Sequence, residues 1–202
     1  RTDERFQMNY LAHLFLSRNY PDDILGNYLA DMMTIEEIDE WPEKLKSGVK
    51  LHHFIDQFTD THEVNKVMKR KLRPYFRKYA GVALDLYYDY FLYQNWNLYS
   101  EFPFAEFVQT QYKHIRKRFH HIPIRLHYTV ERMIRSNFLH RFTTLDGQSY
   151  AFSGLDHRAK FHTGFDQALI VLESHRDEMN RSFNLFFPEL IRAVDEFQRS
   201  RV

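Results

Sequence analysis

The 202-residue chain contains few residues that interrupt helices, and this limits its fold more than any other feature. It has only six glycines and six prolines, and no long segment alternates apolar with polar residues as a half-buried strand would. Hydrophobic residues make up 44% of the chain, which is enough for a substantial core. The sequence therefore predicts an all-α protein that folds as a single compact multi-helix domain.

The breaks between apolar segments predict where individual helices begin and end. A short apolar helix should end near residues 19–21, and Asp22 or Asp23 should cap the next one. A break at residues 41–42 precedes a long helix, and Pro74 predicts a kink or a split in the basic helix that follows. The remaining expected helices are 82–96, 104–119, 123–139, 155–175 and 176–199, with a loop around Gly147 and Gly154 and an interruption at Pro188.

The first seven residues, RTDERFQ, differ from the rest because they are mostly polar, whereas Met8 opens the first apolar segment. We expect residues 1–7 to be an extension or an expression remnant, and residues 8–202 to form the all-α domain. The sequence shows neither a signal-peptide pattern nor an apolar run of the ~20 residues that would span a bilayer. The expected location is the cytoplasm, without membrane contact.

Four apolar segments each carry two polar side chains four residues apart, a spacing that places both on one face of a helix. The pairs are Asn9 with His13, Asn27 with Asp31, His52 with Asp56, and Asp85 with Asp89, and Asp60 extends the third pair by a further turn. Single pairs have ordinary explanations: Asp60 fits a capping box, Asp85 could cap a helix, and a histidine such as His13 is commonly a core residue. Four pairs on four helices can instead converge on one interior site.

Ionisable side chains gathered in a core are costly unless they are paired or bound to a metal. The chain has twelve histidines and no cysteine, so a metal would have only nitrogen and oxygen ligands. Such ligands suit Mn, Mg, Fe or Zn. The sequence therefore favours a buried divalent-metal site over an arrangement of salt bridges and helix caps.

The same segments carry a resemblance to a known family. The ordered motifs MNYLAHLFLS, GNYLADM, GVKLHHFIDQFTD and LDLYYDYFLYQNW resemble those of bacterial acyl carrier protein phosphodiesterases, which are similar to a variant of the HD-domain metal phosphohydrolases. The resemblance begins at Met8, covers most of the chain and is best over the first 96 residues. It implies an HD-domain-like fold, although the chain has no His-Asp dipeptide. The matching polar motif residues are His13, Asn27, Asp31, His52, Asp56, Asp60, Asp85, Asp89 and Trp96.

The resemblance implies hydrolysis of the phosphodiester that joins 4′-phosphopantetheine to a serine of holo-acyl carrier protein, giving the apo protein. The expected metal ligands are His13, His52, Asp56, Asp60 and Asp85, and the expected catalytic residues are Asn27, Asp31 and Asp89. The metal is expected to be Mn²⁺ or Mg²⁺, with Fe or Zn as alternatives, and it would lower the pKa of a bound water. Either Asp31 or Asp89 could accept the water's proton, and the sequence does not distinguish them.

Two segments, residues 66–78 and 113–125, are rich in Lys and Arg, and a solvated helix face is the ordinary explanation of either. Because acyl carrier proteins are small and acidic, we expect the second segment to dock this partner near the mouth of the metal site, through Arg116, Lys117 and Arg118. A net charge of only +1 makes a nucleic-acid surface the less favoured interpretation. Two other functions stay open: a metal phosphohydrolase of another phosphodiester or nucleotide, and a non-enzymatic helical binding protein.

Overall fold

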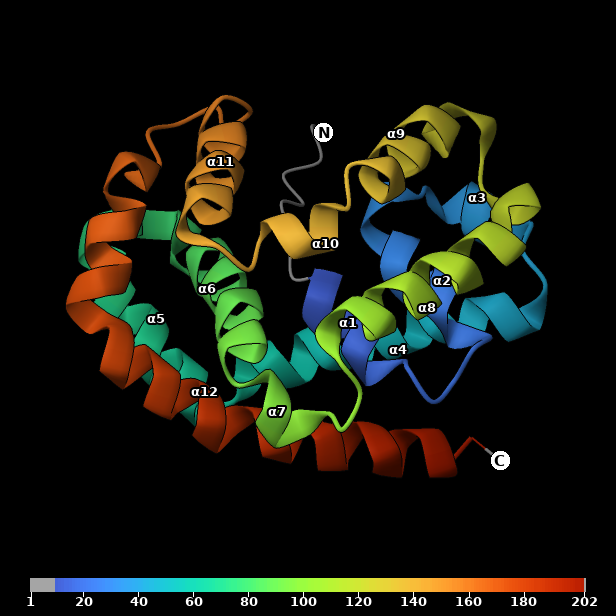
Figure 1. Cartoon of the computed structure of the whole chain (residues 1–202), viewed down its shortest axis with the longest axis horizontal. Coiled ribbons are helices and arrows are strands. Elements are labelled where there is room, and N and C mark those ends of the chain that lie inside the picture. Colours follow the sequence, from blue (N-terminus) through green and yellow to red (C-terminus); the bar gives the residue numbers. More distant parts are fainter. Residues whose placement is uncertain (1–9, 202) are drawn as a thin grey trace.

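A computed structural model describes residues 10–201, which form α-helices joined by short 3-10 turns and loops, with no strand in this range (Figure 1). The prediction of a single all-α domain is confirmed. The expectations for residues 1–7 and for Asn9 lie outside the described residues. No helix in the described range is both long enough and apolar enough to cross a membrane.

The helices are α1 (Tyr10–Leu16), α2 (Asp23–Leu29), α3 (Ile35–Asp39), α4 (Glu43–Thr61), α5 (Glu63–Phe76), α6 (Ala80–Gln94), α7 (Trp96–Tyr99), α8 (Phe104–Lys117), α9 (Ile124–Arg135), α10 (Phe138–Arg141), α11 (Leu145–Asp156) and α12 (Ala168–Arg199).

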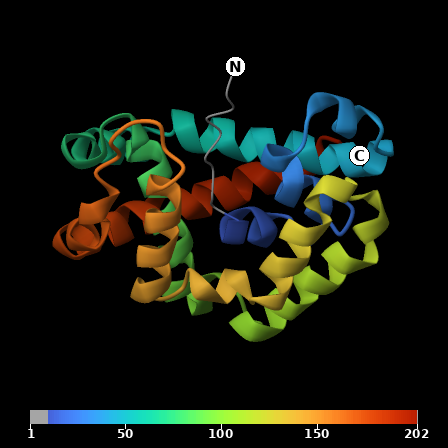
Figure 2. The same cartoon turned by 90° about the horizontal axis from the view of Figure 1, so that it is seen from above.

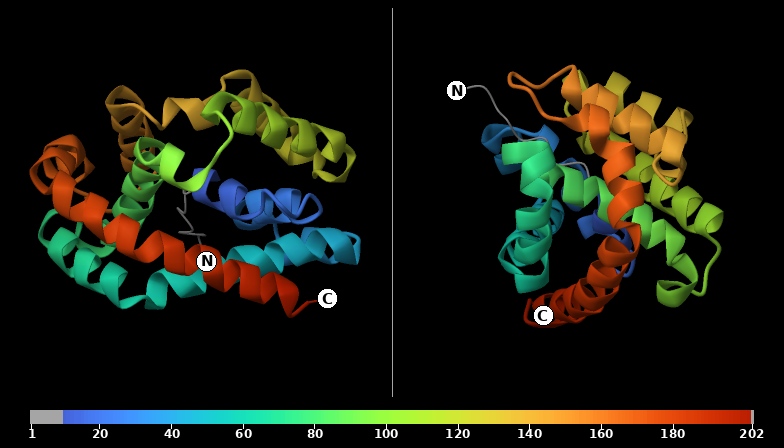
Figure 3. Two further views of the ribbon diagram at one scale, coloured as in Figure 1. Left: turned by 60° about the horizontal axis from the view of Figure 1, so that its bottom comes forward. Right: turned by 90° about the vertical axis from the view of Figure 1, so that its left-hand side faces the viewer.

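The longest helix, α12, runs along most of the molecule and packs against α4, α5 and α6 (Figure 3). The short helix α1 lies near the centre, where it contacts α2 and α6. Seen from above, α1 lies between α11 on one side and α9 on the other (Figure 2). The elements that carry the polar pairs therefore meet in the middle of the fold, where α1, α2, α4 and α6 pack together.

The close crossing of α2 and α4 depends on two glycines. A Cβ atom on Gly26 would lie 2.3 Å from Leu45 O, and a Cβ atom on Gly48 would lie 2.1 Å from Asp23 O. Real Cβ atoms do not approach backbone oxygens so closely, so only glycine fits at either position. This crossing sets the two backbones in contact and brings Asn27, next to Gly26, against His52, one helical turn after Gly48.

Three expectations for the C-terminal half were wrong. The segment around Gly147 and Gly154, expected as a loop, belongs to α11, whose first turn is capped by the Thr144 hydroxyl accepting from Gly147 N. The expected break near residue 175 and the interruption at Pro188 are also absent, because α12 continues through both. A row of apolar side chains along α12, including Met179 and Phe187, is buried in the core. That burial outweighs the one backbone hydrogen bond that a helical proline removes.

One detail of the N-terminal half differs from expectation, and the expected split of the basic helix near Pro74 is present. Neither aspartate at the start of α2 caps it through its side chain. The buried Asp23 carboxylate instead accepts hydrogen bonds from Ser47, Gln198 and Arg201, which tie α2 to α4 and to the end of α12. Pro74 lies in the last turn of α5, which ends at Phe76 and is followed by a 3-10 turn.

Candidate metal centre

Three of the predicted residues meet at one point. His13 comes from α1, and His52 and Asp56 lie one turn apart on α4. His13 Nε2 lies 3.2 Å from Asp56 Oδ1, and His52 Nε2 lies 3.1 Å from Asp56 Oδ2. One nitrogen or oxygen atom of each residue lies within 4.8 Å of the others, which is a spacing that can hold a metal ion. Both histidines are buried, and Asp56 is nearly so.

Asn27 on α2 fixes the orientation of both imidazoles. Its side-chain Nδ2 donates to the backbone oxygen of His13 at 2.7 Å, which leaves Oδ1 facing His13 Nδ1 at 2.6 Å. The backbone oxygen of Asn27 faces His52 Nδ1 at 2.9 Å. Because both partners are acceptors, each Nδ1 carries the proton and donates it. In a neutral ring, the lone pair is then on Nε2, the atom that faces Asp56.

This tautomer makes the group suitable for a divalent cation. The Nε2 atoms of His13 and His52 are buried, and each faces a carboxylate oxygen of Asp56. Metal-binding histidines commonly donate their other ring nitrogen to a carbonyl or a carboxylate, as both do here to Asn27. Two imidazole nitrogens and a carboxylate form a ligand set without sulfur, which suits the first-row and alkaline-earth ions expected from the sequence.

The charges of the group are strongly coupled. Burial lowers the pKa of His52, but hydrogen bonds and charges from Asp31 and Asp56 outweigh it and raise that pKa to about 10. Burial raises the pKa of Asp56, whereas His13 and His52 outweigh this effect and hold it well below its usual range. In the protein without metal, a proton on His52 therefore balances the carboxylates. A metal ion would have to displace that proton, because only the neutral ring can bind it.

Asp31 lies at the edge of the group. It belongs to the 3-10 turn Ala30–Met32 that continues α2, and its Oδ1 lies 3.3 Å from His52 Nε2. Its side chain is 13% exposed, so it is placed between the buried histidines and the solvent. Of the two carboxylates considered as proton acceptors, this is the one beside the histidines.

Asp89 on α6 has a different environment. Its two carboxylate oxygens accept hydrogen bonds from the backbone N–H groups of Leu11 and Ala12, each at 2.9 Å. These N–H groups belong to the first turn of α1, where a helix leaves donors without internal partners. Burial raises the pKa of Asp89 to about 7, although the two N–H donors act in the opposite direction. Asp89 thus holds the start of the helix that carries His13.

The structure does not bring Asp60 and Asp85 into the group. Asp60 lies inside α4, is not a helix cap, has a side chain that is 66% exposed, and pairs with Lys69 Nζ at 2.5 Å. Asp85 lies within α6, also not as a cap, and borders a small internal cavity together with Thr59. Burial raises the pKa of Asp85 well above its usual range. The motif residue Trp96 is buried, and its indole N–H donates to Phe102 O at 2.8 Å.

The predicted docking residues lie at the end of α8. Arg116 and Lys117 are exposed, and Arg118 pairs with Asp22 at 2.6 Å. Arg125, at the other end of the basic segment, donates to the backbone oxygen of Met32 at 2.7 Å. Since Met32 follows Asp31 in the chain, this end of the segment 113–125 reaches the turn that borders His52.

Sequence reasoning missed two residues that position the site, Gly26 and Gly48. Their role is steric: each leaves room for a backbone oxygen of the opposite helix. The sequence contained a signal, because each is an isolated glycine inside a segment with a helical pattern. Such glycines destabilise a helix and commonly have a packing reason.

The chain is similar to proteins of one family along nearly its whole length. Residues 8–190 match the family model described as "Acyl carrier protein phosphodiesterase". A protein of that name from Klebsiella pneumoniae is 27% identical over 192 residues, which cover 95% of this chain and 100% of the relative. A protein of the same name from Enterobacter sp. (strain 638) is 28% identical over 185 residues, covering 91% and 96%, and one from Yersinia pestis is 25% identical over 192 residues, covering 95% and 100%. No solved structure matches the chain.

Proposed function

The chain belongs to the acyl carrier protein phosphodiesterase family, and on this premise we propose that it removes 4′-phosphopantetheine from holo-acyl carrier protein. The reaction is a hydrolysis: water attacks the phosphorus atom and the bond from phosphorus to the serine oxygen breaks. The products are apo-acyl carrier protein, with its serine hydroxyl restored, and free 4′-phosphopantetheine. The proposal places this reaction in the cytoplasm.

One observation carries the chemical part of the proposal. His13 and His52 come from different helices, yet both direct Nε2 to Asp56, and both are held in that tautomer by Asn27. A purely structural pair of core histidines would not need this shared orientation. It supports a site for a divalent ion, for which we propose Mn²⁺ or Mg²⁺.

When bound, such an ion lowers the pKa of a coordinated water and neutralises charge that develops on the phosphoryl oxygens. His13, His52 and Asp56 would hold it, and Asn27 would keep both imidazoles in the binding tautomer. This assigns Asn27 a positioning role. The alternative for the protein without metal is a protonated His52 that pairs with Asp31 and Asp56.

We assign the proton-accepting role to Asp31. Its partial exposure and its position 3.3 Å from His52 Nε2 support this choice, because a general base must reach an incoming water. Both oxygens of Asp89 already accept backbone N–H groups of α1, which supports a structural role for that carboxylate. Arg116, Lys117 and Arg118 are proposed to attract the acidic carrier protein towards this side of the molecule.

The test is incubation of the full chain with holo-acyl carrier protein and Mn²⁺ or Mg²⁺, followed by mass spectrometry of the carrier protein. The expected result is a loss of mass equal to the 4′-phosphopantetheine group, which is suppressed by a chelator. Metal binding without this loss, together with hydrolysis of another phosphodiester, would assign the site to a different substrate. A lack of both metal binding and hydrolysis would leave a helical binding protein and refute the proposal.

A further inference from the structure

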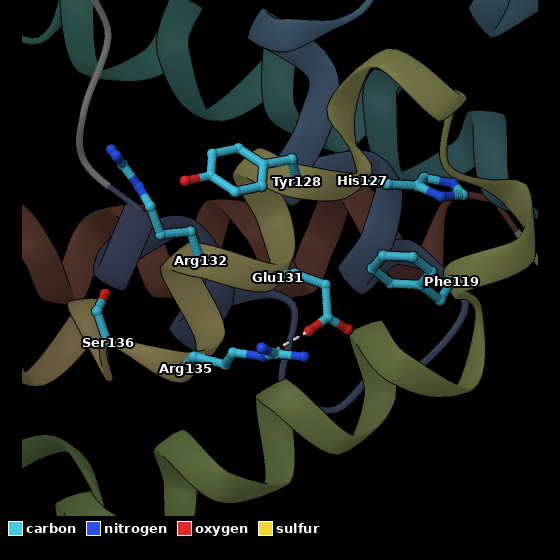
Figure 4. A pocket seen from close by; sticks show the side chains of 7 residues that line it. All are labelled: Phe119, His127, Tyr128, Glu131, Arg132, Arg135 and Ser136. Atoms are coloured by element: carbon cyan, nitrogen blue, oxygen red, sulfur yellow. Dashed lines mark hydrogen bonds and ion pairs between the residues drawn. The ribbon is translucent and has the colours of Figure 1, made fainter.

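The outer face of α9 combines basic and apolar side chains that the proposed reaction does not use. Ile124 and Tyr128 are 86% and 75% exposed. Arg132 and Arg135 follow on the exposed side of the helix, at spacings that keep them near Tyr128. Figure 4 shows Tyr128 and Arg132 projecting from one side of α9, while Arg135 turns to meet Glu131. Large exposed apolar residues beside arginines are typical of protein interfaces.

A groove runs along the same helix. Its volume is about 670 Å³, and its lining mixes aromatic rings with charged side chains. The lining residues are Phe119, His127, Tyr128, Glu131, Arg132, Arg135 and Ser136 (Figure 4). A concave surface of this kind can receive side chains from a partner, with the arginines placed to bind carboxylates.

The charge of the chain is distributed unevenly along the sequence, and the segment that leads into α9 and forms it is basic. Residues 113–135 contain seven Lys and Arg and one acidic residue, a net charge of +6. Because the whole chain has a net charge of +1, the remainder is net negative. A local positive potential of this kind attracts an acidic macromolecule and sets its orientation during encounter.

Two hydrogen bonds connect α9 to the elements around the candidate metal centre. Tyr28 on α2 donates a hydrogen bond from its hydroxyl to Met133 Sδ at 3.4 Å, and Arg125 donates to Met32 O at 2.7 Å. Tyr28 is the neighbour of Asn27, and Met32 is the neighbour of Asp31. The groove therefore lies along a helix that contacts α2 and the turn that carries Asp31, the elements beside the histidines.

We propose that the outer face of α9, with Tyr128, Arg132 and Arg135 at its centre, is the docking surface for the acidic carrier protein. This inference rests on the proposed function, because the partner is its substrate. The carrier protein would place carboxylates on the arginines and an apolar side chain against Tyr128. Its prosthetic group would then extend over α9 to the histidines, while the body of the carrier protein stays outside.

The ion pairs already present on α9 do not oppose this docking. Arg135 pairs with Glu131 one turn away, and Arg125 pairs with Glu37. All four groups are partly or largely exposed, and exposed pairs contribute ~0–1 kcal/mol. Carboxylates of a partner can therefore replace them. Within the described residues Arg132 forms no ion pair, so it is the cation most directly offered to a partner.

The decisive experiment measures direct binding of holo-acyl carrier protein to the full-length chain, by fluorescence anisotropy of a labelled carrier protein at low and at physiological salt. The variant is Arg132→Glu/Arg135→Glu on α9. Its matched control is Arg70→Glu/Arg73→Glu on α5, which has the same spacing, the same charge change and exposed side chains. We expect the α9 variant to raise Kd by about 10-fold or more and to lose most of its salt dependence. The α5 control should change Kd by less than about 2-fold.

A second variant tests the apolar part of the face. Tyr128→Ser removes an exposed ring without a change of charge, so it should raise Kd by about 5-fold or more while the salt dependence stays as in the unaltered protein. Circular dichroism and thermal unfolding verify that each variant is folded. Binding that is absent in the unaltered protein, equal in the α9 variant, or weakened as much by the α5 control would overturn the proposal. So would tighter binding of a short single-stranded oligonucleotide than of the carrier protein.

Because the readout is binding, it separates this inference from the proposed reaction. A carrier protein that binds through α9 but keeps its prosthetic group would support the docking surface and refute the hydrolysis. Release of the prosthetic group with unchanged binding in the α9 variant would refute the docking surface and support the hydrolysis.

Discussion

The imidazole rings of His13 and His52 stack with their centroids 4.3 Å apart and their planes 28° from parallel. Two imidazolium cations at this distance would repel each other, so the arrangement favours a second proton on at most one of the two rings. With both Nε2 atoms against Asp56, the pair presents two nitrogen ligands and one carboxylate to the same point. A divalent ion would satisfy all three at once.

The first prediction concerns Asn27. In Asn27→Ala, His13 Nδ1 loses its acceptor, whereas His52 Nδ1 keeps the backbone oxygen of residue 27. Loss of such an outer hydrogen bond should weaken metal binding by about 10–100-fold. Isothermal titration of the metal-free protein with Mn²⁺ measures this, and Asn97→Ala, at an exposed position of α7, is the control. Equal affinity in folded Asn27→Ala would mean that Asn27 does not orient His13.

The second prediction compares two aspartates on α4. Asp56→Asn removes the carboxylate that both histidines face, so hydrolysis of holo-acyl carrier protein should fall by at least ~100-fold and Mn²⁺ binding should be lost. Asp60→Asn, one turn further on, alters only an exposed carboxylate paired with Lys69, and activity should stay within about 3-fold of normal. If Asp60→Asn proved as inactive as Asp56→Asn, Asp60 would belong to the metal site after all.

The different positions of these aspartates show which part of the site the sequence could predict. His52 and Asp56 are four residues apart, and a helix with 3.6 residues per turn rotates the second by only about 40° from the first. Asp60 is eight residues away, so the rotation doubles to about 80° and points its side chain to solvent. Spacing along one helix therefore predicts the contact between His52 and Asp56, but it does not support the third member of the series.

Contacts between helices were less accessible to sequence reasoning. Asp89 was recognised as a buried carboxylate of a polar pair, but its bonds to Leu11 and Ala12 join residues more than 75 positions apart. Nothing local in the sequence indicates that α6 caps α1. The same holds for α11, where Gly147 and Gly154 suggested a loop although packing of Phe152 against the core keeps the segment helical. Tertiary packing decided both cases.

The third prediction concerns pH and the Asp89 carboxyl group. Its pKa of about 7 in the folded protein lies above the ordinary value near 3.9 in the unfolded chain. Between about pH 4 and pH 7 the folded state therefore binds a proton that the unfolded state has lost, and raising the pH destabilises the fold. The stability that protonated Asp89 contributes is fully present below about pH 4, and it is lost once the pH has risen through about 7.

Urea unfolding of the metal-free protein and of Asp89→Asn at several pH values tests this. The variant cannot ionise at this position, so the free energy of unfolding of the unaltered protein, relative to the variant, should fall by about 1 kcal/mol per pH unit between pH 4 and pH 7. Loss of one N–H acceptor costs the variant the same free energy at every pH, which shifts its curve but not its slope. Parallel curves over this range would show that Asp89 has an ordinary pKa in the folded protein.

The last prediction concerns the crossing of α2 and α4. In Gly48→Ala the new methyl group would lie 2.1 Å from Asp23 O, so the two helices must separate. Overpacking of this kind commonly costs ~1–3 kcal/mol, and here the obstructing atom belongs to a backbone that cannot rotate away. The separation also pulls Asn27 O from His52 Nδ1, so metal affinity should fall together with the free energy of unfolding.

Gly154→Ala is the matched control, because a Cβ atom there has nothing within 4 Å and the residue lies inside α11. Alanine at an open helical position should raise the free energy of unfolding by ~0.5–1 kcal/mol and leave Mn²⁺ affinity unchanged. If urea unfolding and Mn²⁺ titration gave the same result for both substitutions, close contact at Gly48 would not be what positions the metal centre.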